Sequence, residues 1–145
     1  MRRVGLLTDI QSAVAARLRE LEVIAGPVAI EVLEEDKGDL DAQIEKAKGK
    51  LGIVVSVETT GLRRDDSKRE MEMTLVVEIQ EMVAINRGPA GTQRTWMQIS
   101  EEILVSLHGW PPLENLQPLV FQDMGPVAVG SPTVCQLTFT TGMFI

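Results

Sequence analysis

The strongest constraint on the fold of this chain is a pair of alternating apolar segments on either side of a charged connector. Apolar residues occupy every second position from Leu51 to Val57 and again through the run Glu70–Asn86. Side chains of an extended chain point alternately to opposite faces, so each segment predicts a strand with one buried face. The connector, residues 61–69, is mostly charged, and the whole region predicts a β-hairpin with a long loop.

The second segment is too long for one flat strand. Fully extended, the run Glu70–Asn86 would measure about 56 Å at ~3.3 Å per residue, whereas ordinary strands measure ~17–20 Å. If the strands pair from Thr60 onward, the first is used up near Ile79, and residues 80–86 need another partner, either the C-terminal strand or a neighbouring chain. Glu81 interrupts the apolar alternation and predicts a bulge or bend. We therefore expect the hairpin to protrude beyond its own core.

Three other segments have the period of amphipathic helices. The first covers residues 8–22 with Thr8 or Asp9 as its cap, the second lies between Asp39 and Gly49, and the third runs from Thr92 to Gly109. Their apolar stripes are Ile10, Val14, Leu18 and Leu21; Leu40, Ile44 and Ala47; and Trp96, Ile99, Ile103 and Leu107.

Shorter alternating runs predict strands at Val28–Val32, Leu119–Met124 and Thr133–Phe144, with a turn-rich Gly/Pro segment between the last two. Strands mixed with helices in this order predict one domain over residues 1–145. Its fold class is α+β, with a mainly antiparallel sheet, helices on one face and a long protruding β-hairpin.

Composition narrows the class of protein. The chain has 145 residues with 14 Lys+Arg and 21 Asp+Glu, a net charge of −7, which argues against binding nucleic acid through a basic patch. No run approaches the ~20 apolar residues of a membrane span, and the start lacks the apolar core of a signal peptide. We expect a soluble protein of a reducing compartment, in which the lone Cys135 forms no internal disulfide.

The sequence carries no catalytic or metal-binding motif that we recognise. His108 falls in the last turn of the third predicted helix, where an imidazole favours the negative helix end. Cys135 shares the phase of buried residues, which favours burial over reactivity. The acidic clusters 34–36 and 65–66 lack calcium-loop spacing, and Gly88–Gly91 lacks the ending of a phosphate-binding loop. We expect no enzyme, no metal and no cofactor.

Three features suggest assembly. The charged connector can pair with a neighbouring chain or face water, residues 80–86 can lend an edge to a neighbour, and the apolar end of the chain needs a core, its own or a partner's. The candidate contact residues are Arg63, Arg64, Asp65, Asp66, Lys68, Arg69, Glu81, Met143, Phe144 and Ile145.

The order of these elements resembles a known family over almost the whole chain. The residues that carry the likeness are the helix WMQISEEILVSLHGW (96–110), the Leu-x-Gly-Trp-x-Pro segment Leu107–Pro112 and the closing strand QLTFTT (136–141). With the N-terminal helix and the mid-chain hairpin, they resemble the tail terminator (tail completion) proteins of long-tailed bacteriophages, particularly the Mu-like branch.

This resemblance implies a homohexameric ring in the virion tail or neck, assembled in the cytoplasm of a bacterial host. The ring would cap the tail tube, stop its polymerisation and offer the head its docking surface. Its partners would be other copies of itself, the tail tube protein, a head–tail connector protein and, in contractile tails, the sheath protein. No membrane is involved. DNA would pass through the lumen without specific binding, beside walls that carry the acidic excess.

Two other functions remain open at this level. One is a different ring or connector protein of the head–tail neck, which differs from a terminator in its neighbours. The other is a small α+β ligand-binding domain that holds a metabolite on the helix-free face of its sheet.

Overall fold

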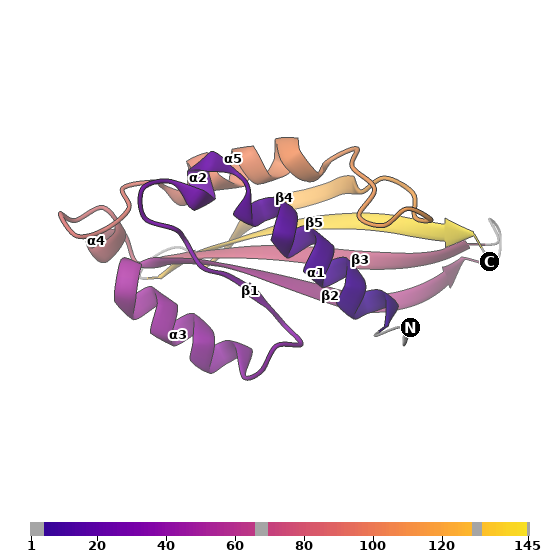
Figure 1. The fold of residues 1–145 in the computed structure, drawn as a ribbon, viewed down its shortest axis with the longest axis horizontal. Helices are drawn as coiled ribbons and strands as arrows, with labels where there is room; N and C mark the ends of the chain where they lie inside the picture. The colour runs from indigo at the N-terminus through magenta and orange to yellow at the C-terminus, as the bar shows by residue number, and fades with distance from the viewer. Residues whose placement is uncertain (1–4, 66–69, 129–131, 145) are drawn as a thin grey trace.

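The computed structural model describes residues 5–65, 70–128 and 132–144. Within these residues five strands form one sheet in the order β1-β2-β3-β5-β4 (Figure 1). The strands are β1 (Val32–Glu34), β2 (Ile53–Asp65), β3 (Glu70–Glu81), β4 (Val120–Ala128) and β5 (Thr133–Phe144). All neighbouring strands are antiparallel except β1 and β2, which are parallel. The predicted α+β class with a mainly antiparallel sheet is therefore confirmed.

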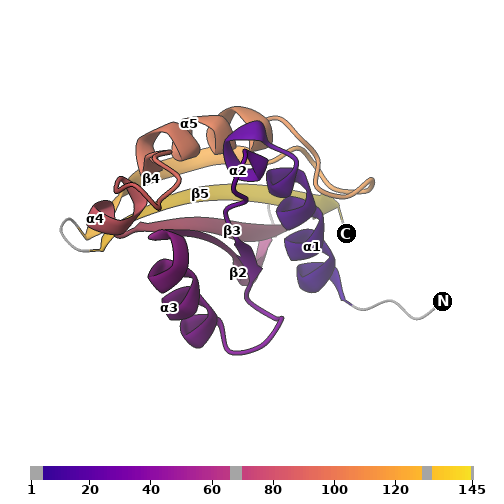
Figure 2. The same ribbon diagram turned by 60° about the vertical axis from the view of Figure 1, so that its left-hand side comes forward.

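The helices lie on both faces of this sheet (Figure 2). They are α1 (Leu6–Arg19), α2 (Glu22–Ala25), α3 (Leu40–Leu51), α4 (Val83–Asn86) and α5 (Trp96–Leu107). The main core lies between the sheet and the layer of α1, α2 and α5, and the apolar positions of β3 and β5 point into it as their alternation predicts. These strand residues are Met73, Leu75, Val77 and Ile79 of β3, and Cys135, Leu137 and Phe139 of β5.

The prediction that all helices share one face is wrong for α3. Ile44 and Ala47 of α3 pack on Val54, whose side chain points away from the main core. The physical reason is the parallel pairing of β1 with β2, because parallel neighbours need a crossover and α3 is that crossover. β1 is also shorter than the predicted strand Val28–Val32: it begins at Val32 and ends at Glu34.

The hairpin is longer in its strands and shorter in its connector than the sequence predicts. β2 continues to Asp65, which pairs with Glu70, so most of the predicted loop is strand. Thr60 pairs with Thr74, and a bulge follows at Gly61, whose φ of +77° lies in the left-handed region open to glycine. The hairpin does not protrude alone, since β5 pairs with β3 along its whole length.

β3 ends at Glu81, and residues 83–86 form α4 where the alternation predicts more strand. Ile53 of β2 pairs with Glu81, so no second partner is needed. Of the predicted bulge or bend at Glu81, the structure has the bend: the strand ends there and the chain turns into α4. Val83 and Ile85 continue the apolar alternation, but both are exposed.

Helix boundaries differ from prediction at several ends. α1 begins before Thr8 and Asp9, with Gly5 at its N-cap. Asp39 caps α3 as predicted by accepting a hydrogen bond from the Ala42 amide at 3.2 Å, but the helix continues through Gly49. α5 begins at Trp96 behind a capping box that Thr95 forms with Gln98, not at Thr92. In the described part of the chain, no helix is long and apolar enough to cross a membrane.

Candidate assembly surfaces

Glu81, a predicted contact residue, lies inside its own subunit. Its side chain is 0% exposed, and one carboxylate oxygen accepts hydrogen bonds from Asn86 Nδ2 at 2.6 Å and Arg87 Nε at 3.1 Å. The other oxygen accepts from Arg87 Nη2 at 3.0 Å and from the Trp96 amide at 3.3 Å. Glu81 therefore joins the end of β3 to α4 and to the start of α5, and its prediction as a contact with another chain is wrong.

Hydrogen bonding decides the ionisation of Glu81. Burial alone raises the pKa of this carboxyl, but the hydrogen bonds from Arg87 and Asn86, together with the Trp96 amide, outweigh burial and hold the pKa below its ordinary value. The carboxylate is thus charged at neutral pH, and the α4 segment folds back around it.

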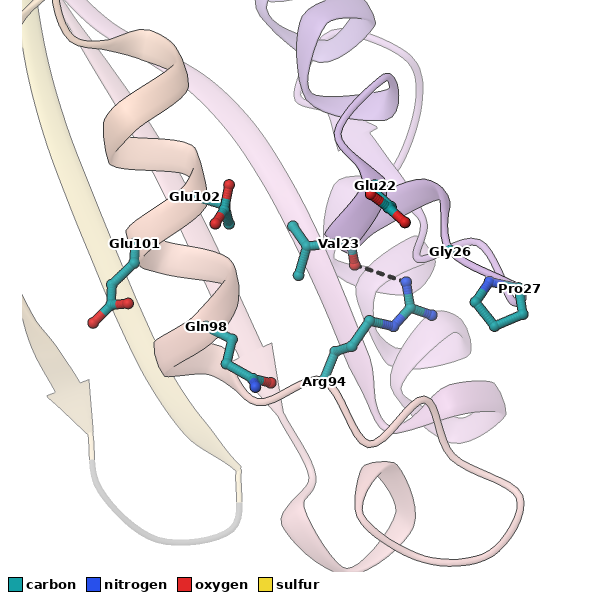
Figure 3. Close-up of a pocket in the computed structure, with 8 residues that line it drawn as sticks. All are labelled: Glu22, Val23, Gly26, Pro27, Arg94, Gln98, Glu101 and Glu102. Carbon is teal, nitrogen blue, oxygen red and sulfur yellow. Dashed lines mark hydrogen bonds between the residues drawn. The ribbon is translucent and has the colours of Figure 1, made fainter.

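A pocket of about 510 Å³ lies between α2 and α5, and Arg94 crosses it (Figure 3). The Arg94 guanidinium donates hydrogen bonds to the carbonyl oxygens of Val23 at 2.7 Å and Ile24 at 3.3 Å, and also to that of Val28. It lies where a side chain at Gly26 would begin. Burial lowers the pKa of Arg94. The group satisfies carbonyls at the end of α2, so it is a structural clamp.

His108 and Cys135 have the structural positions that the sequence predicts. His108 Nδ1 accepts a hydrogen bond from the Phe121 amide at 3.1 Å and thereby joins the end of α5 to β4. Cys135 is fully buried, and burial raises the pKa of its thiol. Among the described residues, no group of three His, Cys, Asp or Glu side chains is placed to hold a metal ion.

The other predicted contact residues that the structure describes gather at one end of the sheet, which we call the distal end. Here Arg64 and Asp65 of β2 pair with Met71 and Glu70 of β3. Met143 and Phe144 of β5 pair with the same two residues from the other side. The structure thus brings the hairpin end and the apolar C-terminal segment together, and the last described residue, Phe144, lies in this subunit's own sheet (Figure 1).

The candidate residues at the distal end differ in how far their side chains are exposed. Arg63 is exposed, while Met143 is partly buried against the main core. The candidates Asp66, Lys68, Arg69 and Ile145 lie outside the described residues.

The sheet face opposite the main core is polar and acidic. Glu78 accepts hydrogen bonds from Gln80 and Gln136, each at 3.0 Å. On the neighbouring strand, burial raises the pKa of Glu58, and the negative charges of Glu35, Glu78 and Asp41 raise it further. α3 covers part of this face, over β2. The polar side of the alternation in residues 70–80 indicates this surface from the sequence alone.

A further apolar surface was not predicted from the sequence. Val105 of α5 is 77% exposed, and it lines a shallow pocket of about 340 Å³ with Leu104, His108 and Phe121. The signal was present, since Val105 falls opposite the apolar stripe of its own helix.

No protein-family model and no curated protein matches this sequence. The fold is similar to that of a chain in the solved structure "Virion of native gene transfer agent (GTA) particle". The two chains align with a TM-score of 0.55 at 16% sequence identity, over 92% of each chain. At this identity the likeness shows a shared fold.

Proposed function

We propose that this protein is a structural component of a phage-like virion, and that it forms the ring that terminates the tail. The observation that carries the proposal is the likeness of fold, over 92% of both chains, to a chain of a gene transfer agent virion. The resemblance to tail terminators, which rests on the order of the elements and on the segment Leu107–Pro112, also supports it.

The architecture suits a ring subunit. A closed ring needs two different surfaces on each subunit that fit each other. Among the described strands, the sheet has two unlike edges, a short parallel strand β1 and a long antiparallel strand β4. The distal end projects between them and is available to whatever lies above or below the ring, such as a tail tube or a head connector.

The acidic sheet face fits the wall of a channel for DNA. The negative charge of Glu78 contributes to the raised pKa of Glu58, and the whole chain carries a net charge of −7. Negative walls repel phosphates and keep a duplex from adhering. We place this face toward the lumen in the proposed ring.

Electron microscopy of the purified protein tests the ring, and we expect six-fold rings with a central hole. Adding the protein to open tail tubes tests the terminator role, with rings expected at tube ends and no further growth of the tubes. Rings that bind head connectors and leave tube ends bare would favour another neck protein. A chain that stays monomeric and leaves tube ends bare would contradict the proposal.

A further inference from the structure

An apolar patch with an acidic border lies along the β4 edge of the sheet. It consists of Leu104 and Val105 of α5, its C-cap residue His108, and Phe121 and Met124 of β4, and we call it the α5–β4 patch. Phe121 and Met124 pair with Phe139 and Leu137, whose side chains face the helices, so both lie on the α5 side of the sheet. Met124 is 41% exposed and Val105 is 77% exposed.

The border of this patch is negative. Glu101 precedes Val105 by one helical turn, and it also lines the Arg94 pocket (Figure 3). Glu102 precedes Val105 by three residues, so it lies beside Val105 on the surface of α5, and it is exposed. After Arg94 the sequence contains four acidic residues and neither lysine nor arginine. Two guanidinium groups from elsewhere in the chain reach α5, and both bond carbonyl oxygens: Arg17 bonds that of Ser106 at 3.0 Å, and Arg94 bonds those of Val23 and Ile24.

The opposite edge of the sheet carries an apolar groove, which we call the β1 groove. Its main part has a volume of about 400 Å³, and a second part of about 270 Å³ adjoins it at Ala29 and Glu31. The apolar residues that line the main part are Ile24, Ala25, Ala29, Ile30, Val32 and Leu33. Ala25 and Ala29 are exposed, so the floor of the groove is open.

The rim of the groove is positive. Arg19, Lys37, Lys46 and Lys50 border its outer side, against the carboxylates of Glu31 and Glu34. Arg19 bonds Glu34 at 3.3 Å, so these two charges cancel, and three lysines remain against Glu31. The β1 edge is therefore apolar with a basic rim, and the β4 edge is apolar with an acidic border.

We propose that the α5–β4 patch of one subunit docks in the β1 groove of a second copy of this chain, and that this contact joins the subunits of the ring. The inference rests on the proposed function and adds the surfaces that form it. The two surfaces lie on opposite edges of one sheet, so each bound copy still presents a free patch and a free groove. Contacts of this head-to-tail kind repeat until a ring closes.

Two substitutions test the contact, one on each surface. Val105→Glu places a charge at the centre of the patch, and Ala29→Glu fills the groove with an acid that repels the acidic border. Both positions are exposed, so the fold tolerates them, and thermal unfolding of the monomers checks this. Each variant should associate on the order of 100-fold more weakly than the wild type, as charging a central interface residue does. The control Thr60→Glu, exposed on the acidic face of β2, should leave association unchanged.

Mixing the two variants tests the head-to-tail arrangement. Val105→Glu keeps a normal groove and Ala29→Glu keeps a normal patch, so an equimolar mixture should form heterodimers of twice the 15.9 kDa monomer mass and nothing larger. Native mass spectrometry measures this directly. The variant that carries both substitutions has neither a working patch nor a working groove, so it should bind neither single variant and should form no ring.

The outcomes separate this inference from the proposed function. If both variants form rings like those of the wild type, the proposed ring is retained and the assignment of its contact surfaces is overturned. Variants that are monomeric alone and stay monomeric when mixed would overturn the head-to-tail contact. A wild-type chain that forms no ring under any condition, tail tubes included, would overturn both.

Discussion

Buried charge at a single residue determines the local fold after β3. The Glu81 carboxylate receives four hydrogen bonds from α4, the following residue Arg87 and the start of α5. Hydrogen bonds to a charged group each contribute more than neutral ones, and an unsatisfied buried donor is costly. This one side chain therefore explains why the chain turns back at residue 82 although apolar residues continue to alternate.

Glu81→Gln tests this directly. The amide can replace one accepting oxygen at most, so we expect the free energy of unfolding at pH 7 to fall by about 2–3 kcal/mol in urea denaturation. The folded pKa of Glu81 lies below its ordinary 4.5, so its stabilising effect is present above that pH and is lost as the pH falls through the folded pKa. The difference between wild type and variant should thus shrink in acid. The control Glu20→Gln, on the exposed end of α1, should change stability by less than about 0.5 kcal/mol.

The ionised carboxylate of Glu58 has the opposite effect on stability from that of Glu81. Its pKa is raised by burial and by Glu35, Glu78 and Asp41, so ionised Glu58 opposes folding at neutral pH. We expect Glu58→Gln to raise the melting temperature at pH 7 by about 1–3 °C, a gain that disappears as acid protonates the wild-type side chain. Glu35→Gln, which removes one repelling charge, should act in the same direction and less strongly. A lower melting temperature for Glu58→Gln at pH 7 would contradict this account of the acidic face.

Local sequence patterns predict some of the secondary-structure elements and not others. The stripe of α5 and the alternation of β3 and β5 are long and regular, and all three bury the predicted faces. β1 has only three residues and pairs in parallel, so its register depends on α3 and not on local pattern. α4 has an apolar pattern typical of a strand, and its true conformation follows from the ion pair of the buried Glu81 with Arg87, which no hydrophobic periodicity reveals.

The candidate surfaces were predictable to a similar extent. The hairpin and the C-terminal segment were each expected to seek partners, but only the register of β3 between β2 and β5 shows that they form one end of one sheet. The α5–β4 patch and the β1 groove join residues far apart in sequence. No local motif marks such surfaces, because what defines them is the order of strands across the sheet.

The C-terminus of α3 offers a paired test at the scale of an element. Gly52 has a φ of +78°, and a side chain there would lie 2.5 Å from the Asn86 amide nitrogen and 2.8 Å from Ile85 Cβ. Gly52→Ala should therefore cost more than about 2 kcal/mol in unfolding free energy, through backbone strain and collision. Gly49→Ala, inside the same helix with open space around it, should stabilise by about 0.5–1 kcal/mol. Equal effects in chemical denaturation would contradict the role of Gly52 as the left-handed cap that lets α4 pack closely.

At the scale of the whole molecule, charge is unevenly distributed between the two edges of the sheet. Opposite edge charges favour correct encounter and register, whereas the apolar surfaces supply most of the attraction. Raising sodium chloride from ~0.05 M to ~0.5 M shortens the Debye length severalfold, so ring formation should weaken and slow. Analytical ultracentrifugation across this range measures the change. Association that is independent of salt would show that the basic rim and the acidic border do not meet.

The position of β5 has a consequence for when this protein becomes competent to assemble. β5 is the last strand in chain order, yet it lies between β3 and β4, so only β5 joins β4 to the rest of the sheet. β5 pairs with β3 along its whole length, from Thr133 opposite Glu81 to Phe144 opposite Glu70. Contacts between residues so far apart in the sequence form late in folding. A nascent chain that has emerged only through β4 has not joined its two edges into one body. Synthesis of β5 thus sets the earliest moment at which a subunit can enter a closed assembly.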